Sequence, residues 1–436
     1  MDPSGRFWRV CAAVLLAFAT LAPPDLRPAQ AAEDADALDV DEAVSIALER
    51  SAALASVRQR AQALAAVPPQ AGSLPDPMIN LGAMNLPVDS FDLAQEAMTQ
   101  LQIGFAQVIP FPGKLALRRE AAEREAEAAA VDVDEARLRL ERDVRVAWWQ
   151  LHYLDRALEV VDRNQALLRQ LVDVAQAAYR VGKGLQQDVL LAELELSRLM
   201  DMELRLRRAR RTAEARFNAL LNRPADTPVR LPLRTGGRFP PPPDERSLYG
   251  NAEAARPLLK ALRARVQAAA TRLAFARRDL MPDFRIGATY GFRQGSGPGG
   301  RERPDFASVM VGIKVPLYAE AKQRRAIDQR NAELMRARSL LEDAWQRVRA
   351  EIGDALAVYR EALDQIELLE RGILPQGRQT LAAMLAAYQV GKVDFLNVVR
   401  AQITLYNDEL RHWEAYSRAH QALARLAAAT GKEIEP

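Results

Sequence analysis

Cysteine and histidine are almost absent from this chain of 436 residues, which has one Cys and three His. This scarcity excludes thiol catalysis, a disulfide scaffold, an iron–sulfur site and a Cys/His zinc site. Lys and Arg (60) nearly balance Asp and Glu (57), so the chain lacks the excess of positive charge that a nucleic-acid binder needs. The acidic residues form no catalytic pair, and no phosphate-binding glycine loop is present. We therefore expect a protein that is no enzyme, holds no metal or cofactor, and works by its shape.

Long apolar runs are also missing, except for one at the N-terminus. Arg6 and Arg9 precede an apolar run at 10–22, and small residues follow at 29–32. A basic start, a short apolar stretch and an Ala-x-Ala site are typical of a secretory signal peptide, here residues 1–31. A membrane anchor is the alternative, but the run is short for a spanning helix. Because Cys11 lies inside this run, we expect no cysteine in the mature chain. If the mature chain crosses a membrane, it must do so with strands.

The sequence repeats itself. Residues 177–183 (AlaAlaTyrArgValGlyLys) return as 386–392 (AlaAlaTyrGlnValGlyLys), and nine of twenty positions in 177–196 are identical to those in 386–405. A proline-rich stretch lies between the two copies, and consecutive prolines favour an extended chain and stop helices on either side. The predicted organisation is a signal peptide at 1–31, a first repeat at 32–223, a connector at 224–243 and a second repeat at 244–436.

Each half contains the same parts in the same order: a helix, a Pro-Asp pair, two alternating segments, a very long helix, a tight glycine turn and a shorter helix. In the first half we expect helices at about 40–67 and 112–180, and a third that ends near 222. In the second half we expect helices at about 256–280 and 319–389, and a third that ends near 430.

The two long helices carry the clearest pattern, with apolar residues that step alternately by four and three. This period of 3.5 residues is typical of a left-handed coiled coil. About 70 residues make a rod on the order of 100 Å, too long and too charged for a bilayer, so the rods must stand in water. Together with the shorter helices, they predict four rods per chain, two continuous and two made from stacked pieces. The seams are residues 140, 144, 147, 151, 154, 158 and 161, and residues 348, 352, 355, 359, 362, 366 and 369.

The four alternating segments each have one apolar face and one polar or small face, which is typical of membrane β-barrel strands. A soluble four-stranded sheet is the alternative. Four strands cannot close a membrane barrel, and open strand edges do not occur in lipid. The pattern therefore fits a membrane only if several chains share one barrel. The apolar positions are 79, 81 and 83; 103, 105 and 109; 284, 286, 288, 290 and 292; and 309, 311, 313 and 315.

Taken together, these features resemble the TolC family of outer-membrane efflux channels. The sharpest matches are the two repeated tip segments and residues 107–114 (GlnValIleProPheProGlyLys), where the second strand turns into the long helix. There Pro favours a helix start and Gly permits the tight turn. The resemblance covers the whole mature chain. It implies a mostly α fold with a small β part: a homotrimer with a 12-strand outer-membrane β-barrel, four strands per chain, continued by a long periplasmic α-helical barrel.

The same resemblance implies a function. Such a channel is the exit duct of a tripartite pump in the outer membrane of a Gram-negative bacterium and extends into the periplasm. Its implied partners are a periplasmic adaptor (membrane fusion) protein, an inner-membrane RND-type transporter and outer-membrane lipid, with no nucleic acid.

Residues 75–91 and the PheProGlyLys turn resemble the heavy-metal branch of the family, the CzcC/CusC-like channels, which implies export of heavy-metal cations. Met78, Met84 and Met98 lie around the first strand pair, and thioethers bind copper and silver. Methionine is also an ordinary filler of barrels and loops, so we predict no metal site there. A drug-efflux channel and a type I protein-secretion channel remain alternatives.

The two repeated glycine turns match the adaptor-docking turns of the family. A Gly between two long helices is by itself the mark of a helix end and a reversal. The repeat of the same flanking Val and Lys favours docking as well. The family commonly has Ser or Thr three residues after the Gly, where this chain has Leu185 and Asp394. The predicted docking residues are Val181, Gly182, Lys183, Val390, Gly391 and Lys392.

Just beyond its tips the family often places acidic residues around the periplasmic aperture. Asp188 matches such a position, whereas its counterpart in the second half is Asn397, with Arg400 one turn further on. The resemblance thus implies aperture roles for these three residues and a thinner acidic ring than usual. A solvated helix face is the alternative.

The remaining candidates indicate packing rather than chemistry. His152, His412 and His420 lie in helical patterns without ligand spacing and are interpreted as structural or surface residues, and Trp148 and Trp149 as packing residues. A pore-less periplasmic adaptor or structural protein is the other class that we consider. It predicts one coiled-coil hairpin with flanking soluble β-domains, and it leaves the apolar strand faces unexplained.

Overall fold

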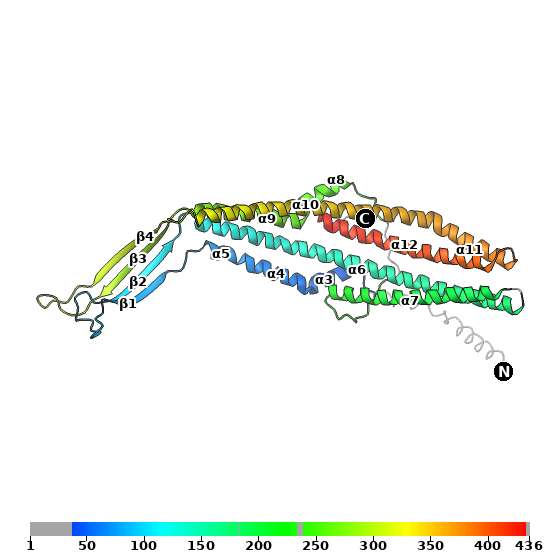
Figure 1. Cartoon of the computed structure of the whole chain (residues 1–436), viewed down its shortest axis with the longest axis horizontal. Helices are drawn as coiled ribbons and strands as arrows, with labels where there is room; N and C mark the ends of the chain where they lie inside the picture. Colours follow the sequence, from blue (N-terminus) through cyan, green and yellow to red (C-terminus); the bar gives the residue numbers. More distant parts are fainter. Residues whose placement is uncertain (1–36, 183, 233–238, 433–436) are drawn as a thin grey trace, which may run out of the picture.

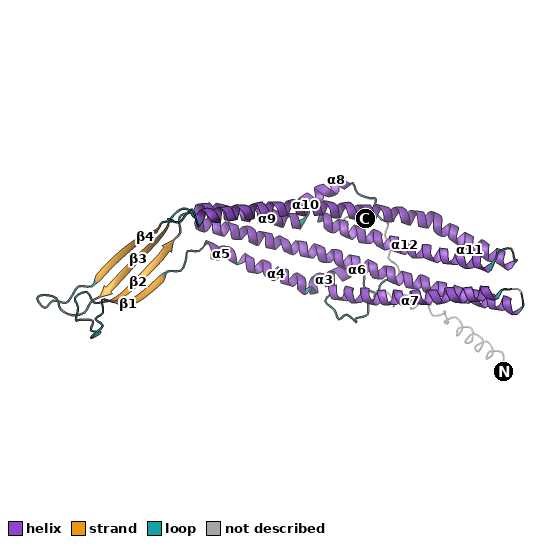
Figure 2. Cartoon of the chain, in the orientation of Figure 1, coloured by secondary structure: helices purple, strands orange, loops and turns teal. Residues whose placement is uncertain are grey.

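The computed structural model describes residues 37–182, 184–232 and 239–432. The predicted signal peptide at 1–31, Lys183 and the central part of the connector lie outside the described residues. The chain is elongated, with a small sheet at one end and two helix-to-helix turns at the other (Figure 1). Helices make up most of the rest (Figure 2), so the expected mostly α fold with a small β part is confirmed.

The elements alternate as the sequence predicts, with a strand pair inside each half. The first half contains α3 (Val40–Arg50), α4 (Ala52–Ala65), α5 (Val67–Gly72), β1 (Met78–Met84), β2 (Gln100–Ile109), α6 (Lys114–Arg180) and α7 (Gln186–Leu220). The second half contains α8 (Glu245–Ala255), α9 (Pro257–Arg278), β3 (Asp283–Phe292), β4 (Phe306–Lys314), α10 (Gln323–Leu368), the π-helical turn η2 (Leu369–Ile373), α11 (Leu374–Gln389) and α12 (Phe395–Thr430).

Four rods result, as predicted. The single helix α6 is one continuous rod, and α10, η2 and α11 together form the other. Two further rods are stacked pieces: Asn222, just after α7, donates a hydrogen bond to the carbonyl oxygen of Arg50 at the end of α3. Arg256, just before α9, likewise donates to the carbonyl oxygen of Ala428 near the end of α12. In the part of the chain that the structure describes, none of the helices is long and apolar enough to cross a membrane.

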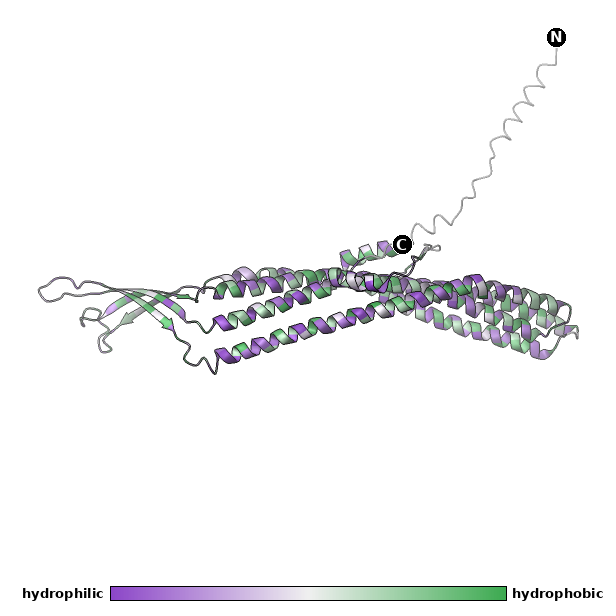
Figure 3. Cartoon of the chain, turned by 90° about the horizontal axis from the view of Figure 1, so that it is seen from above, coloured by the Kyte–Doolittle hydropathy of each residue, from purple (hydrophilic) through white to green (hydrophobic). Residues whose placement is uncertain are grey.

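Side chains of the predicted seams form the core between the rods. All seven seam residues of the second rod are buried, and in α6 Val144, Leu151, Leu154 and Val161 are buried as well. Purple and green alternate along the helices in Figure 3, as expected when each helix buries one stripe and exposes the rest to water. The interpretation of Trp148 and Trp149 as packing residues is confirmed, because both are buried against α3 and α7.

The second long rod differs from the first by one residue. Val161 and Ala177 lie 16 positions apart (177 − 161), whereas their counterparts Leu369 and Ala386 lie 17 apart (386 − 369). The extra residue coincides with η2, where the N–H of Leu374 bonds to the carbonyl oxygen of Leu369. A π turn accommodates such an insertion within a helix. The prediction of one uninterrupted α-helix over 319–389 is therefore wrong at this point.

The four strands form one antiparallel sheet in the order β1-β2-β3-β4. The central pair β2–β3 joins the two halves, with Ile103 opposite Tyr290. Strands β1 and β4 are the two edges, and among the residues that the structure describes each has a strand neighbour on one side only. Because a bare edge exposes unpaired N–H and C=O groups, both edges are suited to pairing with another strand.

The register brings the apolar side chains onto one face of the sheet. Gln107 is the polar exception on this face, and its amide donates to the carbonyl oxygen of Pro75 at 2.7 Å. The opposite face carries Gly, Gln, Thr, Ser, Arg and Lys among its side chains. Exposed large side chains of the apolar face are Ile79, Leu81, Leu101, Ile103, Phe105, Ile286, Tyr290, Phe292, Val309, Val311 and Ile313.

A buried lysine fixes the sheet to the rods. Lys114, the first residue of α6, is 2% exposed, and its ammonium lies 2.9 Å from Asp279 and 2.8 Å from Asp283. It also donates to the carbonyl oxygen of Met281 at 2.8 Å. These three acceptors match the three N–H groups of the ammonium. The contact joins the start of α6 to the α9–β3 connection, and so links the two halves where sheet and rods meet.

Candidate functional site

The first tip is the turn between α6 and α7. After Val181 the chain enters the left-handed region at Gly182, with φ of 72°. The N–H of Gly184 then bonds to the carbonyl oxygen of Ala178 at 3.0 Å. A Cβ on Gly184 would come within 2.9 Å of the Cβ of Ala178, so this glycine is required by close approach. The turn reverses the helix in a few residues, as predicted.

The second tip, between α11 and α12, repeats this geometry. Gly391 also has φ of 72°, and the N–H of Lys392 bonds to the carbonyl oxygen of Ala387 at 2.9 Å. Val181 and Val390 are 68% and 67% exposed, so the two tips present matching apolar side chains to solvent. An added Cβ at Gly182 or Gly391 would meet no heavy atom within 4 Å of the described structure. The tips therefore have room around them.

The two tips lie at the same end of the molecule (Figure 1). Below them Phe395 and Val399 of α12 pack in one cluster with Val172 and Ala175 of α6 and Ala192 of α7. The ring of Tyr388 lies 5.4 Å from that of Phe395. This packing holds the two hairpins side by side, which positions both tips at one end.

The predicted aperture residues lie just below the tips. Asp188 accepts a weak hydrogen bond from the N–H of Leu185 at 3.4 Å, so its carboxylate supports the start of α7, where Leu185 has no polar side chain to do so. Burial, and secondarily the charge of Asp188, raises the pKa of Tyr388. Asn397 and Arg400 are exposed on the first turns of α12.

Apolar side chains on the outside of the first hairpin are a feature that sequence reasoning missed. Their helical spacing resembles that of a seam, and periodicity alone does not tell a buried stripe from an exposed one. They extend from the first tip along α6 and α7. The exposed members are Leu167, Val174, Leu185, Leu190 and Leu194.

Of the methionines near the first strand pair, Met84 has polar neighbours. Met84 accepts hydrogen bonds at its sulfur from the amides of Gln100 and Gln102, at 3.6 and 3.4 Å. Among the described residues, no group of three or more His, Cys, Asp and Glu side chains is arranged to hold a metal ion.

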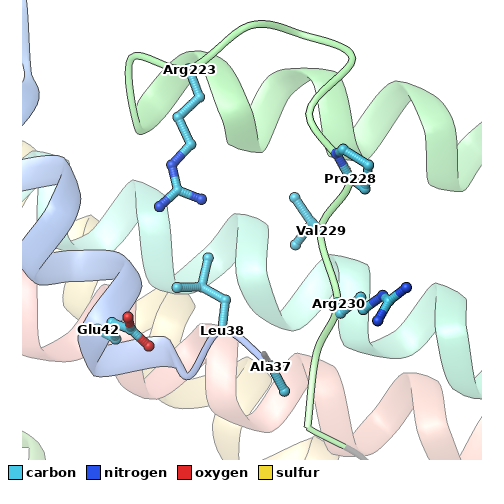
Figure 4. Close-up of a pocket in the computed structure, with 7 residues that line it drawn as sticks. All are labelled: Ala37, Leu38, Glu42, Arg223, Pro228, Val229 and Arg230. Atoms are coloured by element: carbon cyan, nitrogen blue, oxygen red, sulfur yellow. The ribbon is translucent and has the colours of Figure 1, made fainter. Parts of the chain in front are cut away.

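A hollow of about 420 Å³ lies in the middle of the molecule, far from the tips. Figure 4 shows Arg223 and Arg230 on its walls with Glu42. The N–H of Leu38 bonds to the carbonyl oxygen of Arg230 at 2.9 Å, so the hollow lies where the connector crosses the start of the first helix. It is open to solvent and brings together no set of catalytic groups.

Residues 43–223 and 248–432 both match the family model described as outer membrane efflux protein. These two segments make up most of the chain. The chain belongs to this family. A curated relative, the outer membrane efflux protein BepC of Brucella suis biovar 1 (strain 1330), is 25% identical over 288 residues. That alignment covers 66% of this chain and only 62% of the length of BepC.

Solved structures have the same fold. The outer membrane protein VceC from Vibrio cholerae superposes with a TM-score of 0.75 at 20% identity, covering 91% of this chain and 97% of VceC. A solved structure of CusC superposes with a TM-score of 0.75 at 16% identity, covering 90% of this chain and 92% of CusC. The likeness to CusC is no greater than that to VceC, so the fold does not single out the heavy-metal branch.

Family membership bears on the predicted cellular location and on the prediction that the protein is not an enzyme. The family consists of outer-membrane efflux channels of Gram-negative bacteria that extend into the periplasm, so the predicted location is confirmed. These channels are not enzymes, in agreement with the sequence prediction. The pore-less adaptor is thereby set aside.

Proposed function

We propose that this protein is the outer-membrane exit duct of a tripartite efflux pump. It assembles as a homotrimer in which twelve strands close one β-barrel and twelve rods continue it into the periplasm. In this proposal residues 1–31 are removed as a signal peptide, and repeats 32–223 and 244–436 are joined by the connector 224–243.

The apolar face of the sheet is the observation that carries this proposal. Eleven large apolar side chains on all four strands are exposed in the single chain. A continuous apolar patch of this kind is costly in water and favourable against lipid. The opposite face carries mainly polar and small side chains beside the exposed Met78, Met84 and Met310, and it is suited to line an aqueous pore.

The sheet edges support assembly from copies of the chain. Within one chain β1 and β4 each have one strand neighbour, and open edges do not occur in lipid. Pairing of β4 in one copy with β1 in the next satisfies both edges. Three copies supply twelve strands, whereas one copy supplies fewer than the eight or so that a membrane barrel needs.

The tips support a docking role. The rods extend about 100 Å from the sheet, judged from the 67 residues of α6, so the tips reach far into the periplasm. Val181, Gly182, Val390, Gly391 and Lys392, together with Lys183, form the proposed contact with the helical hairpins of a periplasmic adaptor. An inner-membrane RND-type transporter completes the pump.

Asp188, Asn397 and Arg400 are proposed to border the periplasmic aperture. They lie on the first turns of the helices that descend from the tips, and Asn397 and Arg400 are exposed. A carboxylate attracts cations and a guanidinium repels them, so the mixed set gives a weaker preference for cations than an all-acidic ring would.

Heavy-metal cations are the proposed cargo. The support is the resemblance of residues 75–91 and of the turn at 111–114 to the heavy-metal branch, with the fold shared with CusC. The metal is cargo in this proposal, and no resident metal site is implied.

Native mass spectrometry of the protein purified in mild detergent tests the assembly. We expect a trimer that requires detergent to remain in solution. As a control, Ile313→Asp on the apolar face should reduce the amount of trimer in outer-membrane fractions, whereas Ser308→Asp on the polar face of the same strand should not. A stable monomer that needs no detergent would contradict the proposed barrel.

A further inference from the structure

We propose that the junction between sheet and rods binds anionic phospholipid headgroups in the membrane leaflet nearest the rods. This inference rests on the proposed function, because it requires the sheet to lie in the outer membrane. It is carried by exposed basic side chains at the rod ends that face the sheet, which we name the basic collar. The collar consists of Arg118, Arg119, Arg277, Arg278, Lys322, Arg324 and Arg325.

Positive charge is concentrated at this junction. Segments 110–119, 272–283 and 315–325 together hold nine Lys and Arg residues and only three Asp and Glu residues. The whole chain has a formal net charge of only +3. The excess at the junction is thus larger than that of the entire chain, and the rest of the chain is net acidic. An evenly charged rod would not produce this asymmetry.

The helices place the collar close to the strands. Arg118 and Arg119 lie in the second turn of α6, Arg277 and Arg278 end α9, and Lys322 to Arg325 begin α10. These helix ends pack together beside the sheet, with α9 against both α6 and α10 (Figure 1). Two helical turns span only about 11 Å, so the collar stays near the ends of the strands.

The order of side chains along the chain matches a boundary between membrane and water. After β4, Val315 and Leu317 continue the alternation of its apolar face, and both are exposed. Tyr318, 76% exposed, comes next, and Lys322 and Arg324 follow. Apolar residues face acyl chains, Tyr lies at the headgroup level, and basic residues reach phosphates.

The connection from β2 to α6 shows the same order. Phe111 continues the apolar face beyond Ile109, and the guanidinium of Arg278 lies over its ring, 5.3 Å from the centroid. Arg278 also donates to the carbonyl oxygen of Pro112 at 3.2 Å. Arg118 lies over the ring of Phe275 at 4.8 Å. Stacking holds these guanidinium groups at the surface, where their N–H groups can reach a phosphate.

Anionic headgroups suit this surface. An anionic bilayer attracts each nearby Lys or Arg, and the attraction fades over a Debye length of about 8–10 Å. Arg324 and Arg325 pair with Glu320 and Asp328 at 3.1 and 3.0 Å, but these pairs are exposed and therefore weak. A phosphate accepts two parallel bonds from one guanidinium and can replace such a pair.

Lipid titration of the purified trimer tests the collar. Delipidated trimer is mixed with dioleoylphosphatidylglycerol or with zwitterionic dioleoylphosphatidylcholine, and bound lipids are counted by native mass spectrometry. We expect the anionic lipid to bind at least about tenfold more tightly, with a preference that falls as salt is added.

The variants separate a local site from a general charge effect. Arg118→Gln/Arg324→Gln/Arg325→Gln should lose most of the preference. The control Arg205→Gln/Arg347→Gln/Arg371→Gln removes the same charge from exposed ion pairs on the rods, away from the sheet, and should keep it. Equal binding of the two lipids by the wild type, or an unchanged preference in the collar variant, would overturn the inference.

Failure of the proposed function gives a different result. A trimer that floats with phosphatidylcholine vesicles but shows no preference for anionic lipid is consistent with the proposed channel and contradicts the proposed lipid binding by the collar. A protein that remains monomeric and does not float with vesicles of either lipid contradicts both the proposed channel and the proposed lipid binding.

Discussion

Two histidines in the middle of the rods are buried among aromatic rings. The ring of His420 stacks on Trp149 with centroids 3.6 Å apart, and His152 stacks on Trp148 at 5.7 Å. Burial, and secondarily the charge of Arg156, lowers the pKa of His152 to about 4. Burial, with a smaller effect of His152, lowers the pKa of His420 to about 3. Both rings are therefore neutral at pH 7.

The buried histidines make stability depend on pH. An unfolded histidine takes up a proton near pH 6.5, whereas the folded ones resist protonation down to about pH 4 and 3. The unfolded state thus binds more protons in this window, and stability falls as the pH falls from about 6.5. We expect a loss on the order of 2 kcal/mol per histidine at pH 5, measured by thermal unfolding of the trimer between pH 7 and 5.

The double variant His152→Phe/His420→Phe is measured beside the wild type. Its thermal stability should depend much less on pH, because no buried imidazole remains. His412→Gln serves as the control, because it leaves both buried rings in place and should keep the wild-type slope. Parallel slopes for the wild type and the double variant would show that the pH dependence has another source.

The tip glycines allow a second test at the scale of the residue. Gly182→Glu/Gly391→Glu places a charged side chain on each tip and should abolish crosslinking to the adaptor and export. The positive φ itself costs a residue with a Cβ only about 1 kcal/mol, so trimer yield should stay normal.

Alanine at both tip glycines distinguishes the effect of backbone strain from the effect of a bulky charged side chain that blocks docking. Gly182→Ala/Gly391→Ala has the same backbone strain but a small side chain in open space, so docking should survive. Full crosslinking and full export in the glutamate pair would show that the tips are only helix ends.

At the scale of the element, the π turn η2 keeps the buried stripe of α11 on the same side of the rod as the buried stripe of α10. The buried seam of this rod runs through α10 to Leu369, the first residue of η2, and the next buried position is Leu374, five residues on. In α6 both Asn164 and Gln165 are buried after Val161, and Gln165, four residues on, is the counterpart of Leu374 at the offset of 209 between the two tips. Pro375 follows directly, at the start of α11, where its missing N–H is tolerated. The turn thus absorbs one residue without rotating the tip.

Deletion of Gly372 combined with Pro375→Ala should convert this rod into a continuous helix. The deletion shortens the step from Leu369 to Leu374 from five residues to four. The side chains beyond it therefore keep their partners. Pro375 must be replaced because a proline inside a helix costs about 3 kcal/mol. Thermal unfolding of the trimer should shift by only a few degrees.

Deletion of Asp162, an exposed residue of α6, is the matched control. The continuous helix has no π turn to remove, so every residue beyond the deletion rotates by about 100° relative to its partners. We expect this variant to lose the trimer. If both deletions behave alike, the π turn is not the register insertion that we infer.

At the scale of the whole molecule, cargo is the property that fold does not reveal. If the heavy-metal proposal is correct, cells that lack the protein should become sensitive to copper, silver, zinc, cobalt or cadmium, with little change toward dyes and antibiotics. Growth curves in the presence of each metal, dye or antibiotic measure this sensitivity. The wild-type gene should restore resistance, and the gene for Gly182→Glu/Gly391→Glu should not. The opposite pattern would move the protein to the drug-efflux branch without affecting the fold.

The sequence by itself determined the local elements of this protein. Helix α6 and the end of α12 lie within a few residues of their predicted positions, and each strand contains its predicted alternating positions except 315, because 3.5-residue and two-residue periodicities are properties of neighbouring positions. The positive φ of both tip glycines follows from the same local logic, since a long helix must reverse there.

Only the tertiary structure decided what covers each face. Leu190 and Leu194 have the spacing of a seam and yet are exposed, whereas His152 looks like any polar helix residue and yet is buried. The pairing of β2 with β3 and the ion contacts of Lys114 with Asp279 and Asp283 join residues more than 160 positions apart. Periodicity fixes which side chains share a face, but the partner of that face depends on how distant segments pack, and that information is not local.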